Sequence, residues 1–415
     1  MLLTAVAVCA LAIRGHRIFD GYWFTDFTYL AERVAHFGEP DMLSRTDFKV
    51  PFPYPVPSIY AYLFFIRLFP NPLAAYLVFA ILSFFVATCW FSLHVKRIAP
   101  GWLPQVAVWS TLLFGYPLWY LIVRGNIEAV IWVLILFGIV AYTRNRMLTS
   151  AILWALATSM KIAPGLLFAL FLAKRKYRIF AIAIAVTVVF SVLALAGVGP
   201  TIRQALSDSS KSAPYLRHTY ILGRISPYFD ESLFATTKQV ISLYHYAHRT
   251  GDQPFPLIFS GMENALRIYD ILIPIGAVLL YWFRLRHLPL LNQCIAYIVL
   301  SILLPQVSYE YKLVQMYLAW GAFLLFLLAD VAAGRAEIPA WATHVMLFSC
   351  AVIFVPLTSL LVVTRGSHIF IFAAQVKTIF LVLILLTVLR VPMPSSLFGD
   401  LRTLPGGSQP EPDLN

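Results

Sequence analysis

Charged residues are scarce in this sequence of 415 residues, where they make up 12% of the chain against 60% for hydrophobic residues. Soluble domains carry roughly 25% charged residues, and the mean hydropathy here is +0.79. Apolar runs long enough to cross a hydrocarbon layer of about 30 Å recur from one end of the chain to the other. The composition therefore excludes a soluble fold and predicts an all-α polytopic integral membrane protein.

The sequence also has few cysteines and lacks the short motifs of soluble enzymes. Its four cysteines lie far apart inside apolar runs, which indicates buried thiols and no disulfide or zinc site: Cys9, Cys89, Cys294 and Cys350. No GxGxxG, GxxxxGKS/T, HExxH or GxSxG pattern is present. Chemistry driven by ATP or by a metal therefore has no motif behind it, and we expect no cofactor, although scattered carboxylates leave a metal site open.

The net charge of +12 comes from short basic clusters between apolar runs, a placement typical of membrane topology that gives no indication of nucleic-acid binding. We predict about ten to twelve transmembrane helices, with spans near residues 1–18, 72–94, 102–122, 127–142, 178–198, 262–283, 288–305, 313–330, 341–363 and 369–389. With the N-terminus inside, the clusters HVKR, TRNR, KRKYR, RLRH and GRAE become cytoplasmic turns. The first run lacks a basic leader and a clear cleavage site, so we interpret it as a span.

One segment, MLTSAILWALATSMKIAPGLLFALFLA at residues 147–173, breaks the alternation because basic clusters flank both of its ends. Each half is about 12 residues, or roughly 18 Å of helix, which is too short for a full span. Lys161 and Pro164 lie at its midpoint, where a helix is expected to break. We therefore predict a broken or re-entrant helix pair with Lys161 at its tip, buried in protein or lining a cavity.

Two stretches are too polar and too long to be turns, namely about residues 19–71 and 199–261. The topology places both on the extracytoplasmic face, and the end of the first, near residues 58–71, resembles an interfacial amphipathic helix. No internal repeat or soluble domain is visible, so residues 1–392 form one membrane-embedded domain. Residues 393–415 have the composition of a disordered cytoplasmic tail.

Asp26 lies in GYWFTDFTYLAERV, where four aromatic residues crowd around one carboxylate. Burying such a group is costly unless it is paired or has a function. The following TYLAERV is typical of a helix start, so Asp26 is either a helix N-cap or a catalytic base. The pattern alone favours the cap.

Further polar residues lie at the predicted outer ends of spans. WYLIVRGNIEAVIW holds Arg124, Asn126 and Glu128, which form either an ordinary Gly-Asn turn or the edge of a polar cavity. Lys161 needs a counter-charge or a phosphate unless its side chain snorkels to the interface.

The late outer turn PQVSYEYKLVQMY places Glu310 beside Lys312, either as a surface pair or as part of a site. The second long loop gathers charged residues that would suit an anionic head group but are also common in outer loops: Arg217, His218, Arg224, Asp230 and Glu231.

Six stretches carry a resemblance to a known family, in chain order: DF at 26–27, FPYPVPSIY at 52–60, RGNIEAVIW at 124–132, SMKIAPGLL at 159–167, DESLFATTKQVI at 230–241 and SYEYKLVQ at 308–315. Their order resembles the polyprenol-phosphate-dependent glycosyltransferases of the C-type membrane fold, family 87. That bacterial family includes mannosyltransferases and arabinofuranosyltransferases of the cell envelope. The resemblance implies a C-type fold and a bacterial plasma membrane enzyme with its active site on the extracytoplasmic face.

The resemblance implies that a sugar on a polyprenyl phosphate is attacked by a hydroxyl of a glycolipid or glycan acceptor. Asp26 corresponds to the catalytic base of the family, and a single base without a nucleophile favours inversion at the anomeric carbon. The candidate cations for the donor phosphate are Lys161, Arg224, Lys312 and, more weakly, Arg124. The candidate substrate-binding residues are Tyr54, Asn126, Glu128, Glu310 and His218.

Two other classes of function compete with this interpretation. Secondary transporters and lipid flippases also use broken helices, but they often show two repeated halves and place key charges mid-span. Here the charges gather at the outer ends of spans, which favours the enzyme. An envelope polymer ligase or polymerase would share the large outer loop and a lipid-linked donor.

Overall fold

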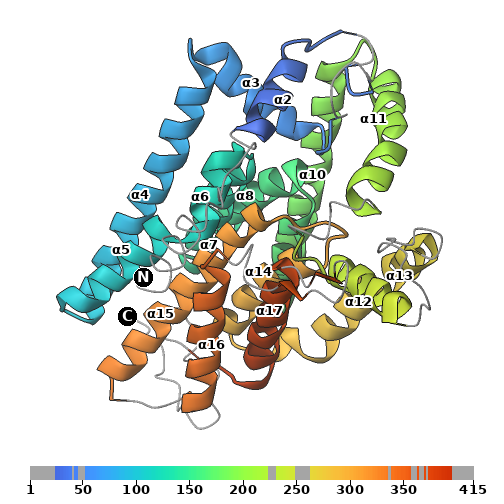
Figure 1. Cartoon of the computed structure of the whole chain (residues 1–415). Coiled ribbons are helices and arrows are strands. Elements are labelled where there is room, and N and C mark those ends of the chain that lie inside the picture. Colours follow the sequence, from blue (N-terminus) through green and yellow to red (C-terminus); the bar gives the residue numbers. More distant parts are fainter. Residues whose placement is uncertain are drawn as a thin grey trace.

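The computed structural model describes residues 24–39, 42–44, 52–222, 230–247, 262–334, 338–356, 362–363, 369–370 and 373–394. The helices, in chain order, are α2 (Thr25–Val34), α3 (Pro57–Leu68), α4 (Pro72–Ile98), α5 (Trp102–Phe114), α6 (Tyr116–Arg124), α7 (Glu128–Thr143), α8 (Met147–Met160), η1 (Ala163–Phe168), α9 (Ala169–Ala173), α10 (Tyr177–Val198), α11 (Ile202–Leu216), η2 (Arg217–Ile221), α12 (Leu233–Ala247), α13 (Met262–Phe283), η4 (Leu285–His287), α14 (Leu290–Leu303), η5 (Glu310–Gln315), α15 (Met316–Ala332), α16 (Ala340–Ile353) and α17 (Ala373–Arg390). A short antiparallel pair joins β1 (Val362–Val363) to β2 (Ile369–Phe370). The predicted helical class is therefore confirmed (Figure 1).

Five helical stretches within the described residues are long and apolar enough to cross a membrane: Pro72–Ile98, Trp102–Arg124, Tyr177–Val198, Met262–His287 and Glu310–Ala332. Shorter apolar helices accompany them, among them α7, α8, α14 and α16. The chain is thus a multi-pass membrane protein. The predicted span at 1–18 and the tail from residue 395 lie outside the described residues.

Two predicted spans differ from the structure in detail, and proline explains both differences. The span near 102–122 is two helices, because α5 stops before Gly115 and α6 restarts with Pro117 in its first turn. The span near 341–363 is helical only to Ile353. Pro356 follows shortly after, and the residue before a proline is driven away from helical backbone angles.

The segment at 147–173 is a helical hairpin with the predicted break at Lys161. α8 ends at Met160, Lys161 is extended (φ −155°, ψ 124°), and the chain continues as η1 and α9. The two ends of the segment lie at the same level, because the Tyr142 hydroxyl donates to the Leu170 carbonyl at 2.9 Å and Lys174 Nζ lies 4.4 Å from the Tyr142 ring. The hairpin therefore brings Lys161 to the end of the bundle opposite these residues.

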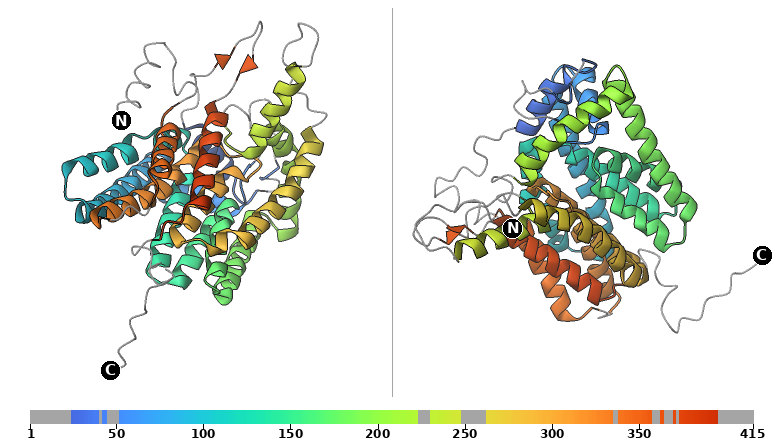
Figure 2. Two further views of the ribbon diagram at one scale, coloured as in Figure 1. Left: turned by 90° about the horizontal axis from the view of Figure 1, so that it is seen from below. Right: turned by 90° about the vertical axis from the view of Figure 1, so that its right-hand side faces the viewer.

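α14 forms the centre of the bundle, and all of its residues are buried. It contacts α15, α17, η1 and η5, and one continuous hydrophobic core runs from α2 to the end of α17. α4 and α5 lie on one side of this centre and α13 on the opposite side (Figures 1 and 2). α10 and α13 contribute little to the core, since most of their apolar side chains are exposed.

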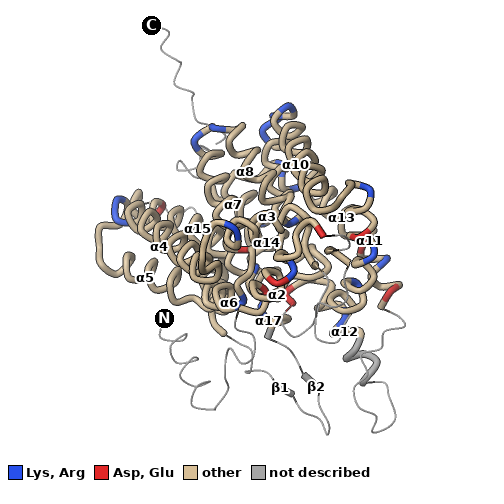
Figure 3. Tube along the Cα trace, turned by 90° about the horizontal axis from the view of Figure 1, so that it is seen from above, with Lys and Arg blue, Asp and Glu red and all other residues tan. Residues whose placement is uncertain are grey.

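Charge is distributed unevenly along the bundle. Figure 3 shows Lys and Arg at the tips of α8 and α10, whereas α2, α12 and the start of α17 lie at the other end of these helices. The predicted long outer stretches are not open loops, because the first holds α2 and α3 and the second holds α11, η2 and α12. These elements gather over the end of the bundle at which Lys161 lies.

A tight turn between α6 and α7 locks this end together. Gly125 follows α6 with φ 66°, and a Cβ added to it would come within 2.6 Å of Phe27 Cβ. Only glycine combines this left-handed backbone with such close approach. The turn is thereby pressed against the first turn of α2, which carries Asp26.

Candidate active site

Asp26 lies in the first turn of α2 and does not cap it. The N-cap is Phe24, which has left-handed backbone angles and no side-chain cap hydrogen bond, while the Phe24 amide donates to the Val123 carbonyl at 2.5 Å. The helix-cap interpretation of Asp26 is therefore wrong. The carboxylate instead faces the α6–α7 turn, where Arg124 pairs with Oδ1 and Asn126 Nδ2 donates to Oδ2 at 2.7 Å.

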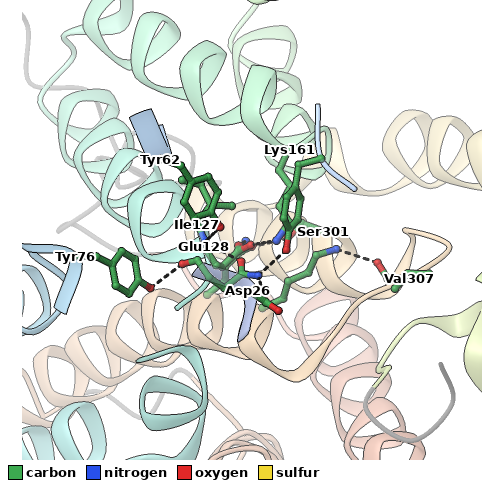
Figure 4. A network of polar contacts seen from close by, with 12 residues as sticks. Asp26, Tyr62, Tyr76, Ile127, Glu128, Lys161, Ser301 and Val307 are labelled. Atoms are coloured by element: carbon green, nitrogen blue, oxygen red, sulfur yellow. Dashed lines mark hydrogen bonds and ion pairs between the residues drawn. The ribbon is translucent and has the colours of Figure 1, made fainter. Parts of the chain in front are cut away.

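Asn126 is the hub of the contacts around Asp26, and it is fully buried. Its Nδ2 donates to the Tyr54 hydroxyl at 2.6 Å as well as to Asp26, and its Oδ1 accepts the amide of Glu128 at 3.0 Å. The Tyr76 hydroxyl donates to the Asn126 carbonyl at 2.8 Å (Figure 4). Every polar atom of the Asn126 side chain is thus used within the protein, and the arrangement fixes the orientation of Asp26.

Tyr54 is a neutral partner in this cluster. Burial raises the pKa of its phenol, and the nearby Asp26 carboxylate raises that pKa further. Tyr54 therefore stays protonated at neutral pH. Asp26, whose side chain is 12% exposed, is the carboxylate of this cluster that solvent can reach.

A second set of contacts joins Glu128 to Lys161 at the hairpin break. Lys161 Nζ pairs with Glu128 Oε2, and the Gln315 amide donates to Glu128 Oε1. Gln315 Oε1 in turn accepts the Ser301 hydroxyl at 2.8 Å. The counter-charge of Lys161 is therefore the Glu128 carboxylate, and the buried Lys161 side chain does not snorkel to an interface.

The Lys161 ammonium also lies against aromatic rings, 4.6 Å from the centroid of Tyr311 and 5.5 Å from that of Tyr54. Tyr54 bonds Asn126, so the ring connects the Lys161–Glu128 pair to the Asp26 cluster. Cation–π contacts of this kind are worth about 0.5–2 kcal/mol, more where water is excluded. The two sets of contacts therefore form one polar network at the end of the bundle (Figure 4).

Lys312 is a buried cation at the edge of this network. Its Nζ donates to the Val307 carbonyl at 3.1 Å (Figure 4). Among the described residues no carboxylate lies within ion-pair distance of it, in contrast to Arg124 and Lys161. A desolvated ammonium bound only by a carbonyl is costly, so this position suits an anionic ligand.

Glu310 pairs with a residue that the sequence did not indicate. Its Oε1 accepts Lys377 of α17 at 2.7 Å, and its Oε2 accepts the Tyr116 hydroxyl at 2.5 Å. Glu310 and Lys377 are fully buried. Of the two interpretations of Glu310 and Lys312, the surface pair is therefore wrong, because the two side chains of η5 contact different partners.

Glu231 lies near the Glu310–Lys377 pair. Neither of its carboxylate oxygens has a hydrogen-bond partner within the described part of the chain. Its backbone is fixed, since its amide donates to the Ser308 carbonyl at 2.8 Å and its carbonyl accepts the Thr378 hydroxyl at 3.1 Å. Burial raises the pKa of the Glu231 carboxyl, Glu310 raises it further, and Lys377 partly offsets both. Its surroundings therefore favour the neutral form of the carboxyl over the charged form.

This raised pKa predicts a pH-dependent effect of Glu231→Gln on folding. A carboxyl whose pKa is higher in the folded than in the unfolded protein stabilises the fold fully at a pH below its unfolded-state pKa. This stabilisation is lost as the pH rises through the folded-state pKa, by at most about 1.4 kcal/mol per pH unit. We expect Glu231→Gln to match the wild type in thermal unfolding near pH 5 and to be more stable at pH 8–9. Glu263→Gln, at a half-exposed position 3.9 Å from Arg217 Nε, is the control and should show no such trend. A constant difference across the pH range would contradict the prediction.

The remaining predicted residues fall outside the network. His218 is exposed in η2 (Arg217–Ile221), and the described residues offer it no hydrogen bond or ion pair. η2 nevertheless borders the site, because Tyr220 and Tyr309 have ring centroids 6.4 Å apart. Arg224 lies outside the described residues. Among the described residues no three His, Cys, Asp or Glu side chains are grouped as metal ligands would be.

The comparisons with known proteins agree with the helical membrane architecture. Residues 52–305, more than half of the chain, match glycosyltransferase family 87. A comparison with curated proteins found no match, and neither did one with solved structures. The matched region contains Tyr54, the α6–α7 turn and Lys161. Family membership favours a sugar-transferring enzyme over the transporter or flippase considered above. The chain belongs to glycosyltransferase family 87 and is an enzyme that transfers a sugar.

Proposed function

We propose that this enzyme transfers a sugar, mannose or another hexose or pentose, from a polyprenyl-phosphate donor to an envelope glycolipid or glycan. The reaction takes place on the extracytoplasmic face of a bacterial plasma membrane, within a single membrane-embedded domain of the C-type fold. The observation that carries the proposal is an accessible carboxylate, Asp26, oriented by two donors beside a polar network that ends in the buried cation Lys312.

Asp26 acts as the general base. Arg124 and Asn126 each occupy one position on its oxygens, which leaves a lone pair for the proton of the acceptor hydroxyl. That hydroxyl oxygen forms a bond to the anomeric carbon while the bond from this carbon to the phosphate oxygen breaks. The electron pair stays on the phosphate and the proton passes to Asp26. One displacement inverts the anomeric configuration.

Cations stabilise the departing phosphate. Lys312 has no carboxylate partner among the described residues, so its charge is available to the leaving group. Lys161 lies in the same network but is shared with Glu128, and Arg124 holds Asp26. Arg224 stays a proposed ligand from the sequence. In a site that excludes water, fixed charges aimed at the leaving group contribute strongly to catalysis.

The test is transfer by the purified full-length protein in lipid nanodiscs. The reaction receives a panel of polyprenyl-phosphate sugars and envelope glycolipids, and products are identified by mass and by the anomeric coupling in NMR. We expect one glycosylated acceptor and one polyprenyl phosphate for each donor consumed, with inversion. Transfer from nucleotide sugars alone, or retention of configuration, would overturn the proposal.

The unpaired position of Lys312 predicts the effect of Lys312→Met. Removing the ammonium takes away a charge-assisted contact to the donor phosphate, worth about 1.5–3 kcal/mol. We expect kcat/KM for the donor to fall about tenfold to hundredfold, while KM for the acceptor stays close to the wild-type value. Lys211→Met on α11, an exposed lysine, is the matched control. Equal effects on the two substrates would contradict a role at the donor phosphate.

A further inference from the structure

Tyr220 lies in a widened helical turn at the border of the site. η2 follows α11 directly, and the Leu222 amide donates to the carbonyl of Arg217, five residues earlier, at 2.9 Å, which is the π-helical bond. Single π-helical turns are rare and frequently occur at functional sites. The proposed mechanism assigns no role to Tyr220, although this side chain is half-buried at the edge of the site.

The two residues after Tyr220 fix its direction. Ile221 and Leu222 pack in a small hydrophobic cluster with residues of α12 and α13, and Lys238 Nζ of α12 donates to the Ile221 carbonyl at 2.5 Å. The Tyr220 ring takes no part in this cluster. It contacts Tyr309 instead, with the ring centroids 6.4 Å apart and the ring planes at 79°. η2 is thus attached to α12 and α13, while Tyr220 faces the turn between α14 and η5.

Tyr309 is held in place on the other side of this contact. Its backbone pairs with Asp230 in an isolated antiparallel bridge, so its position is fixed by the main chain. The centroid of its ring lies 5.9 Å from that of Tyr311, and the Tyr311 ring in turn contacts the Lys161 ammonium. Tyr220 and Tyr309 therefore form an aromatic corner, from which a row of rings leads to Lys161.

The aromatic corner lies on the Asp26 side of the polar network. Among charged groups, Asp26 and Arg124 have the strongest electrostatic effect on the Tyr220 phenol. Burial raises the pKa of this phenol to about 12, with Tyr215 and Asp26 contributing to the rise, so Tyr220 is a neutral O–H donor at neutral pH. Tyr220 and Tyr309 are both half-buried. Part of each ring is therefore accessible beside the proposed general base.

We propose that Tyr220 and Tyr309 determine acceptor specificity by holding a sugar ring of the acceptor against Asp26. The identification of the ligand as the acceptor rests on the proposed function, because the acceptor is the substrate whose hydroxyl meets the base. A sugar ring presents C–H groups on its faces and hydroxyls at its rim. The C–H groups pack on aromatic faces, which carry partial negative charge, while the rim reaches the Tyr220 O–H and the Asp26 carboxylate.

This arrangement favours a hydroxyl carried by a sugar ring over that of a simple alcohol. An acyclic alcohol can bring its oxygen to Asp26, but it covers neither ring of the aromatic corner and is therefore poorly oriented for attack. The donor is oriented from the other side, since the proposed function places its phosphate at Lys312. The two substrates thus meet between the aromatic corner and the lysines.

The first test measures binding alone, by saturation-transfer NMR on the full-length protein in lipid nanodiscs. The probes are methyl mannoside, methyl glucoside and methyl arabinofuranoside, with glycerol as a molecule that has hydroxyls and no ring. We expect saturation of the ring C–H protons of at least one glycoside, and a signal about threefold weaker or less in Tyr220→Leu. Tyr220→Phe retains the ring and should keep most of the signal. Tyr177→Leu, at an exposed position at the start of α10, is the matched control and should equal the wild type.

A glycoside signal no stronger than that of glycerol would overturn the inference, and so would equal signals in the wild type and Tyr220→Leu. If Tyr220→Leu does not fold, Tyr309→Leu decides, because the bridge to Asp230 is formed by the backbone and does not need the ring. The same loss of signal is expected for Tyr309→Leu.

The second test compares the kinetics of sugar transfer. In Tyr220→Leu we expect KM for the glycolipid acceptor to rise about twofold to tenfold, while KM for the donor stays close to the wild-type value. An equal rise for both substrates, or a rise confined to the donor, would overturn the inference. A glycoside signal that depends on Tyr220, in a protein that transfers from no donor, would refute the proposed function and leave the sugar-binding role of Tyr220 standing.

Discussion

Replacing Asp26 by Asn is expected to lower the rate of sugar transfer by about a hundredfold to ten-thousandfold, the range over which a general base contributes. Asn keeps the size of the side chain, and its oxygen can still accept from Arg124 or from Asn126. It cannot take the proton of the acceptor hydroxyl. The loss should therefore appear in kcat, with KM for both substrates changed little.

The measurement is transfer by wild-type and variant protein in the same nanodiscs, with the amount of folded protein checked by gel filtration. Asp208→Asn in α11 is the matched control, since Asp208 pairs with Lys211 at 3.2 Å away from the network, and we expect it to keep the wild-type rate. Transfer by Asp26→Asn within threefold of the wild type would assign the base to another group. A loss confined to KM would make Asp26 a binding residue.

Much of the architecture follows from residue patterns that act locally. Hydropathy runs and basic clusters predicted the long spans, and the isolated Lys161 with Pro164 predicted the break in the hairpin. A charge in an apolar run needs a reason, so Lys161 and Glu128 could be identified as candidate site residues from the sequence. Their mutual pairing was not predicted, because they are 33 residues apart, Glu128 at the start of α7 and Lys161 at the break after α8.

The partners of the other site residues depend on contacts between distant parts of the chain. Arg124 and Asp26 are 98 positions apart, and the pairing depends on Gly125 letting the turn approach Phe27. The hydrophobic periodicity of α2 or of α6 does not predict that these two elements approach each other. Asp26 therefore resembled a helix cap when only its neighbours in sequence were considered.

Lys377 and Gln315 were missed for a different reason. Lys377 lies in AAQVKTIF and Gln315 in SYEYKLVQMY, and neither has a nearby proline or glycine to mark a break, as Lys161 has. The lysine in AAQVKTIF could have indicated a site, because a charged side chain in a membrane helix is expected to have a counter-charge. That partner, Glu310, lies 67 residues earlier in the chain. Both residues lie beyond the part that matches the family.

The largest effect on folding is expected from breaking the buried Glu128–Lys161 pair on one side only. Glu128→Gln leaves the Lys161 ammonium without its carboxylate, and the loss of one partner of a buried pair costs about 3–5 kcal/mol. The amide introduced by this substitution can still accept from Gln315, but it offers no negative charge. We expect a clear drop in the thermal unfolding midpoint, measured by tryptophan fluorescence in nanodiscs. The same exchange at a half-exposed position, Glu263→Gln, should leave the midpoint close to the wild-type value.

The double variant Glu128→Gln, Lys161→Met removes both charges of the buried pair. It therefore distinguishes the cost of leaving one ion unpaired from the cost of changing the side chains. Removing both charges leaves no unpaired ion, so the double variant should be more stable than Glu128→Gln alone. Its transfer activity should stay low, because the double variant also loses the Lys161 cation that the proposed mechanism places beside the donor phosphate. A double variant no more stable than the sum of its single changes would mean that Glu128 and Lys161 act independently.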